Sequence, residues 1–222
     1  MVEVSTSILS VKKEKIIDTI YELEKAKTDY FHIDVMDGEF VENNTNDIML
    51  EYCEYLNGIT NIPLDVHLMV KDLKNYIDSY SIFKPYIITF HYEACKNDEE
   101  VFEIINYIKE KNIKVGLSIK PETSQEKVYK FLPFIHMILV MTVEPGKGGQ
   151  KLIESSLEKI KLVSNYTAEK KLDVFIEADG GINVENAGCL IENGTDIIVA
   201  GTSVISSKNY PETIRKIKMN IA

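Results

Sequence analysis

The feature that most constrains the fold is a regular alternation between short β-rich runs and longer segments with helical periodicity. Short runs of apolar and β-branched residues predict strands, whereas apolar residues recurring every three or four positions predict helices. We expect strands at residues 2–9, 30–35, 63–68, 86–91, 114–119, 137–141, 173–178 and 196–200. We expect helices at residues 13–26, 47–56, 73–80, 98–111, 124–131, 155–170, 186–193 and 211–219.

Eight strand–helix units in a chain of 222 residues favour a closed parallel barrel, the (βα)8 or TIM barrel of the α/β class. An open, doubly wound sheet is the alternative, because alternation alone does not count strands reliably. The length also permits two small domains, but no linker and no shift in composition marks a boundary. We therefore predict a single barrel domain over residues 1–222.

Polar residues inside two neighbouring strands are the first sign of a site. Parallel strands buried on both faces are normally apolar, yet two of these strands read His-Ile-Asp-Val-Met and Asp-Val-His-Leu-Met. Side chains alternate along a strand, so His32 and Asp34 share the inward face, as do Asp65 and His67. One buried His–Asp pair is often only structural. Two adjacent pairs can hold a divalent metal through nitrogen and carboxylate ligands.

Three glycine-containing loops follow late strands of the predicted barrel. Residues 146–149 read Gly-Lys-Gly-Gly, Asp179 is followed by Gly180 and Gly181, and Gly201 follows the last strand. Glycines leave backbone N–H groups free to surround an anion. Late βα loops commonly form the phosphate site of such barrels. We therefore expect the three loops to converge on one phosphate group.

Together these segments resemble the ribulose-phosphate 3-epimerase family, and the resemblance runs along essentially the whole chain. The family's opening strand is similar to residues 5–9, its two metal-strand signatures to residues 32–38 and 65–70, and its phosphate and second-acid signatures to residues 141–150 and 179–182. Several matches in the right order are far more specific than any single match. The resemblance implies an isomerase of carbohydrate metabolism, in the pentose phosphate pathway. Its reaction would be inversion at C3, interconverting D-ribulose 5-phosphate and D-xylulose 5-phosphate.

The resemblance also implies one divalent metal ion per subunit, bound by His32, Asp34, His67 and Asp179. Two nitrogens and two carboxylates suit Zn²⁺, which we favour, and also Fe²⁺, Mn²⁺ or Co²⁺. Asp34 and Asp179 are implied as the two proton-transfer groups, working through a metal-stabilised enediolate. Their surroundings must then separate their pKa values, so that one is ionised while the other is protonated.

Other residues are implied to contact or surround the substrate. Those implied to bind it, mostly through its phosphate, are Ser7, His67, Gly146, Lys147, Gly148, Gly149, Gly180, Gly181, Gly201 and Thr202. Those implied to line the reacting carbons are Met36, Met69 and Met141.

The chain departs from the family pattern at three places. Lys147 stands where the family usually has an aromatic residue, Lys120 stands where asparagine is more usual, and residues 42–44 replace a Pro-Asn pair. None of the three affects the four proposed metal ligands, so they bear on sugar specificity rather than on proton transfer. We hypothesise that Lys147 adds a cation near the phosphate. A lysine that faces only solvent is the alternative.

Three further polar positions lack an assigned chemical role. Glu177 shares its strand face with Asp179, and we expect it to be a hydrogen-bond partner of the site rather than a catalytic group. His91 ends a predicted strand on the ligand side, where a lining or structural role is expected. His136 precedes its strand, at the opposite rim, and is expected to be structural.

Composition limits the partners and the compartment. A formal net charge of −10 argues against binding to nucleic acid or anionic membranes. The longest apolar run, residues 135–143, is about half of what a membrane span needs. Three widely spaced cysteines and no recognisable signal peptide suggest reduced thiols and a cytoplasmic protein. We expect a small sugar phosphate as partner and, as in other barrels of this family, a homo-oligomer.

Three alternative functions stay open at this point. A 3-epimerase of a ketohexose 6-phosphate, such as allulose 6-phosphate, would use the same acids and metal. A barrel decarboxylase or aldolase would need an inward catalytic lysine cluster, and no Asp-x-Lys-x-x-Asp pattern occurs in the sequence. A non-catalytic phosphate-binding barrel would have no reason to keep the four proposed ligands together.

Overall fold

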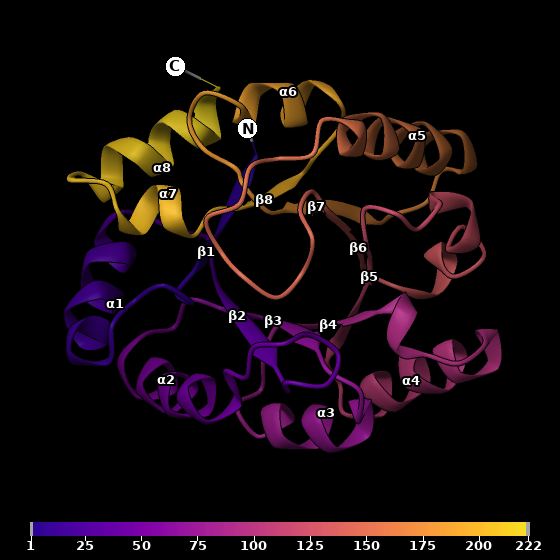
Figure 1. Ribbon diagram of the computed structural model, residues 1–222, viewed down its shortest axis with the longest axis horizontal. Helices are drawn as coiled ribbons and strands as arrows, with labels where there is room; N and C mark the ends of the chain where they lie inside the picture. Colours follow the sequence, from indigo (N-terminus) through magenta and orange to yellow (C-terminus); the bar gives the residue numbers. More distant parts are fainter. Residues whose placement is uncertain (1, 221–222) are drawn as a thin grey trace.

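The computed structural model, which describes residues 2–220, shows a closed barrel of parallel strands ringed by helices (Figure 1). The eight strands follow one another in chain order around the ring, and β1 closes it by pairing with β8. Closure excludes the open doubly wound sheet and confirms the predicted (βα)8 fold. The strands are β1 Glu3–Ser7, β2 Tyr30–Met36, β3 Leu64–Met69, β4 Ile87–His91, β5 Lys114–Ile119, β6 Met137–Met141, β7 Phe175–Asp179 and β8 Ile197–Val199.

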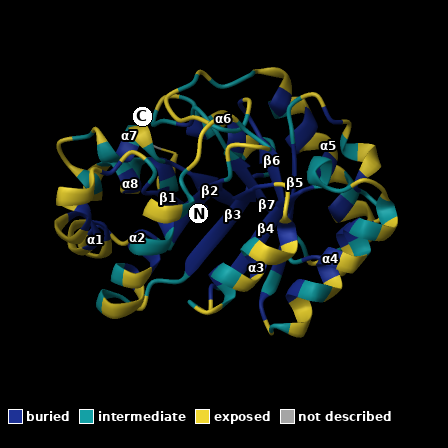
Figure 2. Cartoon of the chain, turned by 60° about the horizontal axis from the view of Figure 1, so that its bottom comes forward, coloured by how far each residue is buried: buried dark blue, intermediate teal, exposed yellow. Residues whose placement is uncertain are grey.

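The helices pack one face on the barrel and expose the other, as the dark inner and yellow outer surfaces in Figure 2 show. In the first helix Ile16, Ile20 and Leu23 are buried, whereas Ile17 and Tyr21 are about half exposed. The α-helices are α1 Ile16–Lys25, α2 Asn46–Ile59, α3 Leu73–Ser81, α4 Asp98–Glu110, α5 Ser155–Lys170, α6 Ala187–Glu192, α7 Thr202–Ile205 and α8 Tyr210–Met219. Four short 3-10 helices complete the set: η1 Lys13–Lys15, η2 Tyr92–Ala94, η3 Gln125–Lys127 and η4 Leu132–Phe134. None of the helices in the described chain combines the length and apolar character that crossing a membrane requires.

The predicted α-helix at residues 124–131 is wrong. This connection between β5 and β6 is built from η3 and η4, and its hydrogen bonds span three residues, from Val128 N to Gln125 O (3.1 Å) and from Phe131 N to Val128 O (2.9 Å). Pro133 has no N–H to donate and disfavours helical geometry in the residue before it. The apolar spacing therefore anchors the segment to the barrel without producing an α-helical turn.

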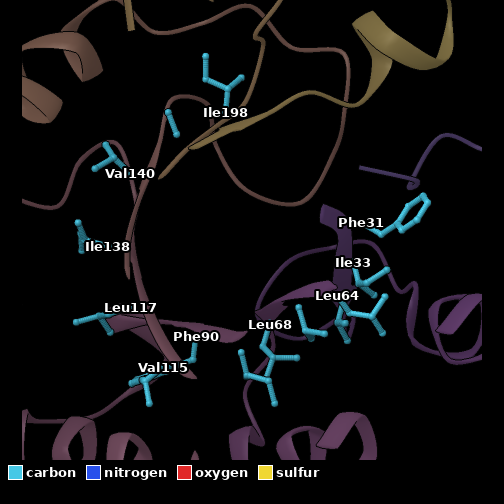
Figure 3. Packing of buried hydrophobic residues seen from close by; sticks show 14 of the residues in the cluster. Phe31, Ile33, Leu64, Leu68, Phe90, Val115, Leu117, Ile138, Val140 and Ile198 are labelled. Atoms are coloured by element: carbon cyan, nitrogen blue, oxygen red, sulfur yellow. The ribbon is translucent and has the colours of Figure 1, made fainter. Parts of the chain in front are cut away.

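Strand parity separates an outer apolar layer from an inner polar one. Phe31, Ile33 and Val140 are fully buried in the large core between the strands and the helices, and Figure 3 shows their side chains turned away from the barrel interior. Burying each such side chain contributes about 1.5–3 kcal/mol. The alternate residues of β2 and β3 point inward, and the register pairs Asp34 with His67. The outer layer thus stabilises the barrel and leaves the inner face of these strands free for polar side chains.

The rims of the barrel differ in the length of their loops. After β6 the chain runs from residue 142 to residue 154 before α5 begins, and Figure 1 shows this loop reaching over the centre of the ring. On the same rim, the loop after β2 is joined to it where the Asn43 amide donates a hydrogen bond to the Gly146 carbonyl (2.6 Å). The two loops therefore border one opening at the carboxyl ends of the strands.

Candidate active site

The four residues predicted to bind a metal come together at the carboxyl ends of β2, β3 and β7. One atom from each of His32, Asp34, His67 and Asp179 lies within 4.8 Å of the corresponding atoms of the other three. His32 Nε2 is 3.4 Å from Asp34 Oδ1, and His67 Nδ1 is 3.5 Å from the same oxygen. His67 Nδ1 is also 3.7 Å from Asp179 Oδ2. One imidazole nitrogen therefore faces both aspartates.

The donor atoms of this group fit a divalent cation. Both histidine side chains are fully buried, and His32 Nε2 and His67 Nδ1 have no hydrogen-bond partner although each points at carboxylate oxygens. A buried polar atom without a partner is costly and usually has a functional explanation. Two such nitrogens and two carboxylates match the ligand preferences of Zn²⁺ and of neighbouring first-row metals. The group can thus hold one metal ion, and its chemistry leaves the element open.

The two aspartates of the group have pKa values displaced in opposite directions. Burial by itself raises the pKa of Asp34, but the charge of His32 and the close approach of the His32 and His67 rings outweigh it, so the pKa falls below the usual range. Burial, with a smaller contribution from the nearby charge of Asp34, raises the pKa of Asp179 to about 6, although His32 and His67 act in the opposite direction. One acid is thus held ionised, and the other keeps a proton up to nearly neutral pH.

A second buried layer lies beneath His32. His32 Nδ1 is 2.6 Å from Asp65 Oδ2, and the Ser5 hydroxyl donates to the same oxygen at 2.7 Å. Glu177 lies beside them, fully buried, and burial together with the charge of Asp65 raises its pKa well above the usual range. Burial lowers the pKa of His32, but the charges of Asp65 and Asp34 raise it more, so in the absence of a metal the imidazole tends to hold a proton. A proton and a metal ion compete for the same nitrogen.

A third element of the site was not anticipated from the sequence. His67 Nε2 is 2.9 Å from His91 Nε2, and His91 Nδ1 is 3.3 Å from Glu93 Oε2. In the sequence, the only sign of this element is the short motif His-Tyr-Glu at the end of β4. Its position behind His67 depends on closure of the barrel. His136, by contrast, lies at the opposite rim against Tyr86 and Phe175, where a structural role was expected.

Above the four clustered residues opens a cavity of about 920 Å³. Ser7 lines it and donates its hydroxyl to Asp34 Oδ2 at 2.6 Å. His67, also predicted to contact substrate, does not line the cavity but lies buried below its floor. The remaining predicted substrate and lining residues all border the cavity: Met36, Met69, Met141, Gly146, Lys147, Gly148, Gly149, Gly180, Gly181, Gly201 and Thr202.

The glycines after β7 are required by the geometry of the cavity wall. Gly180 has φ +123°, and a Cβ there would lie 2.3 Å from Val143 Cγ2. Gly181 has φ +67°, and a Cβ there would lie 2.5 Å from the backbone nitrogen of Leu152. Residues with a side chain rarely adopt either backbone conformation, and the close contacts leave no room for a Cβ atom. Glycine therefore lets the β7 loop pass close against the long β6 loop, as the predicted convergence of these loops requires.

Comparison with known proteins assigns the chain to a family. Residues 3–205 match the model of the ribulose-phosphate 3 epimerase family. The chain belongs to this family. The ribulose-phosphate 3-epimerase of Bacillus subtilis is 38% identical over 219 residues, covering 98% of this chain and 99% of that relative. The ribulose-phosphate 3-epimerase of Methanocaldococcus jannaschii is 33% identical, covering 98% of this chain and 90% of its own length.

Membership in the ribulose-phosphate 3-epimerase family confirms the resemblance found in the sequence and, with it, the prediction of an isomerase. Solved structures agree on the fold. The 3-hexulose-6-phosphate synthase of Salmonella typhimurium superposes with a TM-score of 0.69 at 13% identity, covering 99% of this chain and 98% of that one. Identity this low supports the shared barrel and nothing further about chemistry.

Proposed function

We propose that this protein interconverts D-ribulose 5-phosphate and D-xylulose 5-phosphate by inversion at C3, using one divalent metal ion and two aspartates. Family membership and the names of the relatives support the substrate. The observation that carries the mechanism is the placement of Asp34 and Asp179 at 3.5 and 3.7 Å from the same nitrogen of His67, on the floor of the cavity.

Inversion needs a proton removed from one face of C3 and another returned to the opposite face. Asp34 lies near the carboxyl end of β2 and Asp179 ends β7, and these strands stand three positions apart around the ring of eight. The two carboxyl groups therefore approach a bound sugar from different sides. The C3 hydrogen is acidic because the C2 carbonyl is adjacent. Ionised Asp34 accepts that proton while protonated Asp179 donates its own, and the reverse reaction exchanges the two roles.

His32 and His67, with the two aspartates, would hold the metal. When bound there, a divalent ion supplies a Lewis acid beside the reacting carbons. Zn²⁺ is the first candidate, with Fe²⁺, Mn²⁺ and Co²⁺ as alternatives. Ser7 orients Asp34 through its hydroxyl. The three methionines that border the cavity, Met36, Met69 and Met141, are each only 2% exposed and keep water away from the reacting carbons.

The phosphate of the substrate is assigned to the loops after β6, β7 and β8. Their glycines expose backbone N–H groups, which bind an anion without side-chain cations. The side chain of Thr202 approaches Gly148, with Oγ1 3.5 Å from where a Cβ would stand. The loops after β6 and β8 thus meet at one corner of the cavity, which supports placing the phosphate there.

We also propose that the enzyme acts in the cytoplasm, on a small molecule, as a homo-oligomer. The thiols of Cys53, Cys95 and Cys189 are unpaired, which suits a reducing compartment. The net charge of −10 disfavours nucleic acid and anionic membranes as partners.

The decisive experiment incubates the purified protein with ribulose 5-phosphate in deuterated water. We expect deuterium at C3 together with xylulose 5-phosphate, loss of both after treatment with a chelator, and recovery on adding Zn²⁺. The same assay with allulose 6-phosphate is the comparison. Faster turnover of the hexose phosphate would make the protein a ketohexose 6-phosphate epimerase. Tight phosphate binding without exchange on either sugar would make it a non-catalytic phosphate-binding barrel.

A further inference from the structure

A row of buried polar groups extends behind His67, on the side away from the two aspartates. His67 Nε2 lies 2.9 Å from His91 Nε2, and His91 Nδ1 lies 3.3 Å from Glu93 Oε2. Both histidines are fully buried, and their rings stack with centroids 5.0 Å apart. The row starts at the nitrogen of His67 that is not aimed at the proposed metal position.

We infer that Glu93 and His91 fix the tautomer of His67, keeping its hydrogen on Nε2 and leaving the lone pair of Nδ1 directed at the metal. Both are positioning residues, because neither borders the cavity and each acts through the next group in the row. The inference rests on the proposed role of His67 as a metal ligand.

The direction of the hydrogen bonds follows from the far end of the row. Glu93 Oε1 accepts the backbone N–H of Lys120 at 2.9 Å and the hydroxyl of Thr123. Burial alone raises the pKa of Glu93, but its hydrogen bonds, that with His91 foremost, lower it to about 2, so the group is a carboxylate. A carboxylate only accepts hydrogen bonds. The nitrogen that faces it, Nδ1 of His91, must therefore carry a hydrogen.

The state of His67 follows from that of His91. His91 is fully buried, and in its neutral form the hydrogen on Nδ1 leaves the second nitrogen, Nε2, as an acceptor. The short contact between the two Nε2 atoms then needs a hydrogen on His67. Because a neutral imidazole carries only one N–H, Nδ1 of His67 is left as a ligand.

The surroundings of the row keep water from competing. The ring of Phe40, from the loop after β2, packs on His91 with centroids 4.9 Å apart. The ammonium group of Lys120 lies 4.5 Å from the centroid of the same Phe40 ring. Lys120 is one of the positions where the sequence departs from the family pattern. Through this contact it packs on the Phe40 ring that covers His91.

The two histidines of the proposed metal group are oriented by different means. Asp65 engages Nδ1 of His32 at 2.6 Å, which leaves Nε2 facing the site. His91 engages Nε2 of His67, which leaves Nδ1 facing it. Each partner engages one ring nitrogen of its histidine and leaves the other nitrogen for the metal. The free nitrogen is Nε2 in His32 and Nδ1 in His67.

Nitrogen NMR on protein labelled with ¹⁵N at histidine tests the wild type directly, with Zn²⁺ as the probe. We expect His67 to carry its hydrogen on Nε2 and to bind zinc through Nδ1, and His91 to carry its hydrogen on Nδ1. Zinc bound to His67 through Nε2, or a His91 protonated on Nε2, would overturn the inference alone. Zinc that binds without shifting either nitrogen of His67 would overturn the proposed metal group and the inference with it.

Zinc affinity, measured by competition with a chromogenic chelator, gives a second readout that does not depend on turnover. Glu93→Gln keeps the size of the side chain but removes the charge, and we expect zinc binding to weaken by about 10- to 100-fold. Glu122→Gln is the matched control, because Glu122 is an exposed glutamate in the loop after β5, between Lys120 and Thr123, and the zinc affinity of this variant should equal that of the wild type. Unchanged zinc affinity in a folded Glu93→Gln protein would contradict the inference. If that variant does not fold, the NMR result on the wild-type protein decides.

Discussion

The carboxyl ends of β2 and β7 each present an aspartate to the same imidazole, in very different surroundings. Asp34 accepts a hydrogen bond from Ser7 at 2.6 Å, faces His32 at 3.4 Å and has a side chain only 8% exposed. The side chain of Asp179 is 16% exposed, and the imidazole of His67 approaches it at 3.7 Å. Two identical side chains on one cavity floor thus acquire opposite proton affinities from their neighbours. In the proposed proton transfer, surroundings rather than residue type would assign the two roles.

The largest expected effect comes from removing either acid. Asp34→Asn and Asp179→Asn should each lower kcat by at least about 100-fold, as expected when a general acid or base is lost. The two variants should differ in what they retain. Each variant keeps one acid, which can still remove a proton from one face of C3. Each should therefore still exchange the C3 hydrogen of one epimer with solvent deuterium, and the two variants should act on opposite epimers.

The measurement is deuterium uptake starting separately from ribulose 5-phosphate and from xylulose 5-phosphate. Zinc content is determined in parallel, so that loss of the ion is not mistaken for loss of an acid. Near-normal turnover in either variant, or exchange of the same epimer in both, would refute the assignment of one acid to each face.

A smaller effect, and one of opposite sign in the two variants, is expected on the stability of the metal-free protein. Asp34 has a folded pKa below its ordinary value of 3.8, so its charge stabilises the fold above that pH, and the contribution is lost as the pH falls toward the folded pKa. Asp179 has a folded pKa of about 6 against an ordinary 3.8, so the fold loses stability as the pH rises from about 4 to about 6.

Asparagine resembles the protonated acid at each position. At pH 7, Asp34→Asn should lower the free energy of unfolding and Asp179→Asn should raise it, each by on the order of 2 kcal/mol. Urea unfolding in the presence of a chelator, between pH 4 and pH 8, provides the measurement, with the exposed Asp173→Asn as control. A shift of the same sign in both variants would show that the two surroundings do not differ as described.

Local periodicity explains why much of this site could be predicted from sequence. A strand alternates its side chains regardless of its partners, so the inward placement of His32 with Asp34 and of Asp65 with His67 follows from spacing alone. The conformation of residues 124–131 does not follow in the same way. Their apolar spacing suits a helix, yet the proline beyond them disfavours an α-helix through this segment, and 3-10 turns form instead.

Contacts between distant segments could not be predicted. The hydrogen bond from Ser7 to Asp34 joins two different strands and follows from no local pattern. The orientation of His67 depends on Glu93, which is itself held by residues that follow β5. No local pattern records which segments become neighbours when the barrel closes, although the family signatures bring the right residue types to the rim.

The smallest expected effect concerns the exposed loop after β6, which borders the cavity. Lys147 borders the cavity from the loop after β6, and its side chain is exposed. An exposed charge near a bound phosphate contributes at most about 1 kcal/mol and is screened by salt. Lys147→Ala should therefore raise KM for the sugar phosphate by roughly two- to fivefold at low ionic strength, reduce the salt dependence of KM and leave kcat unchanged.

Lys151→Ala is the control for Lys147→Ala, since Lys151 is an exposed lysine of the same loop that does not border the cavity. It removes the same unit of charge from the protein, and its KM should stay at the wild-type value. If both variants change KM equally, the effect is a general one of net charge on the approach of an anion. If neither changes it, Lys147 faces only solvent, and the glycine-rich loops bind the phosphate through their backbone N–H groups. Only a change confined to Lys147→Ala would extend the contrast between the two ends of the cavity, with proton transfer at buried acids and anion binding at an exposed loop.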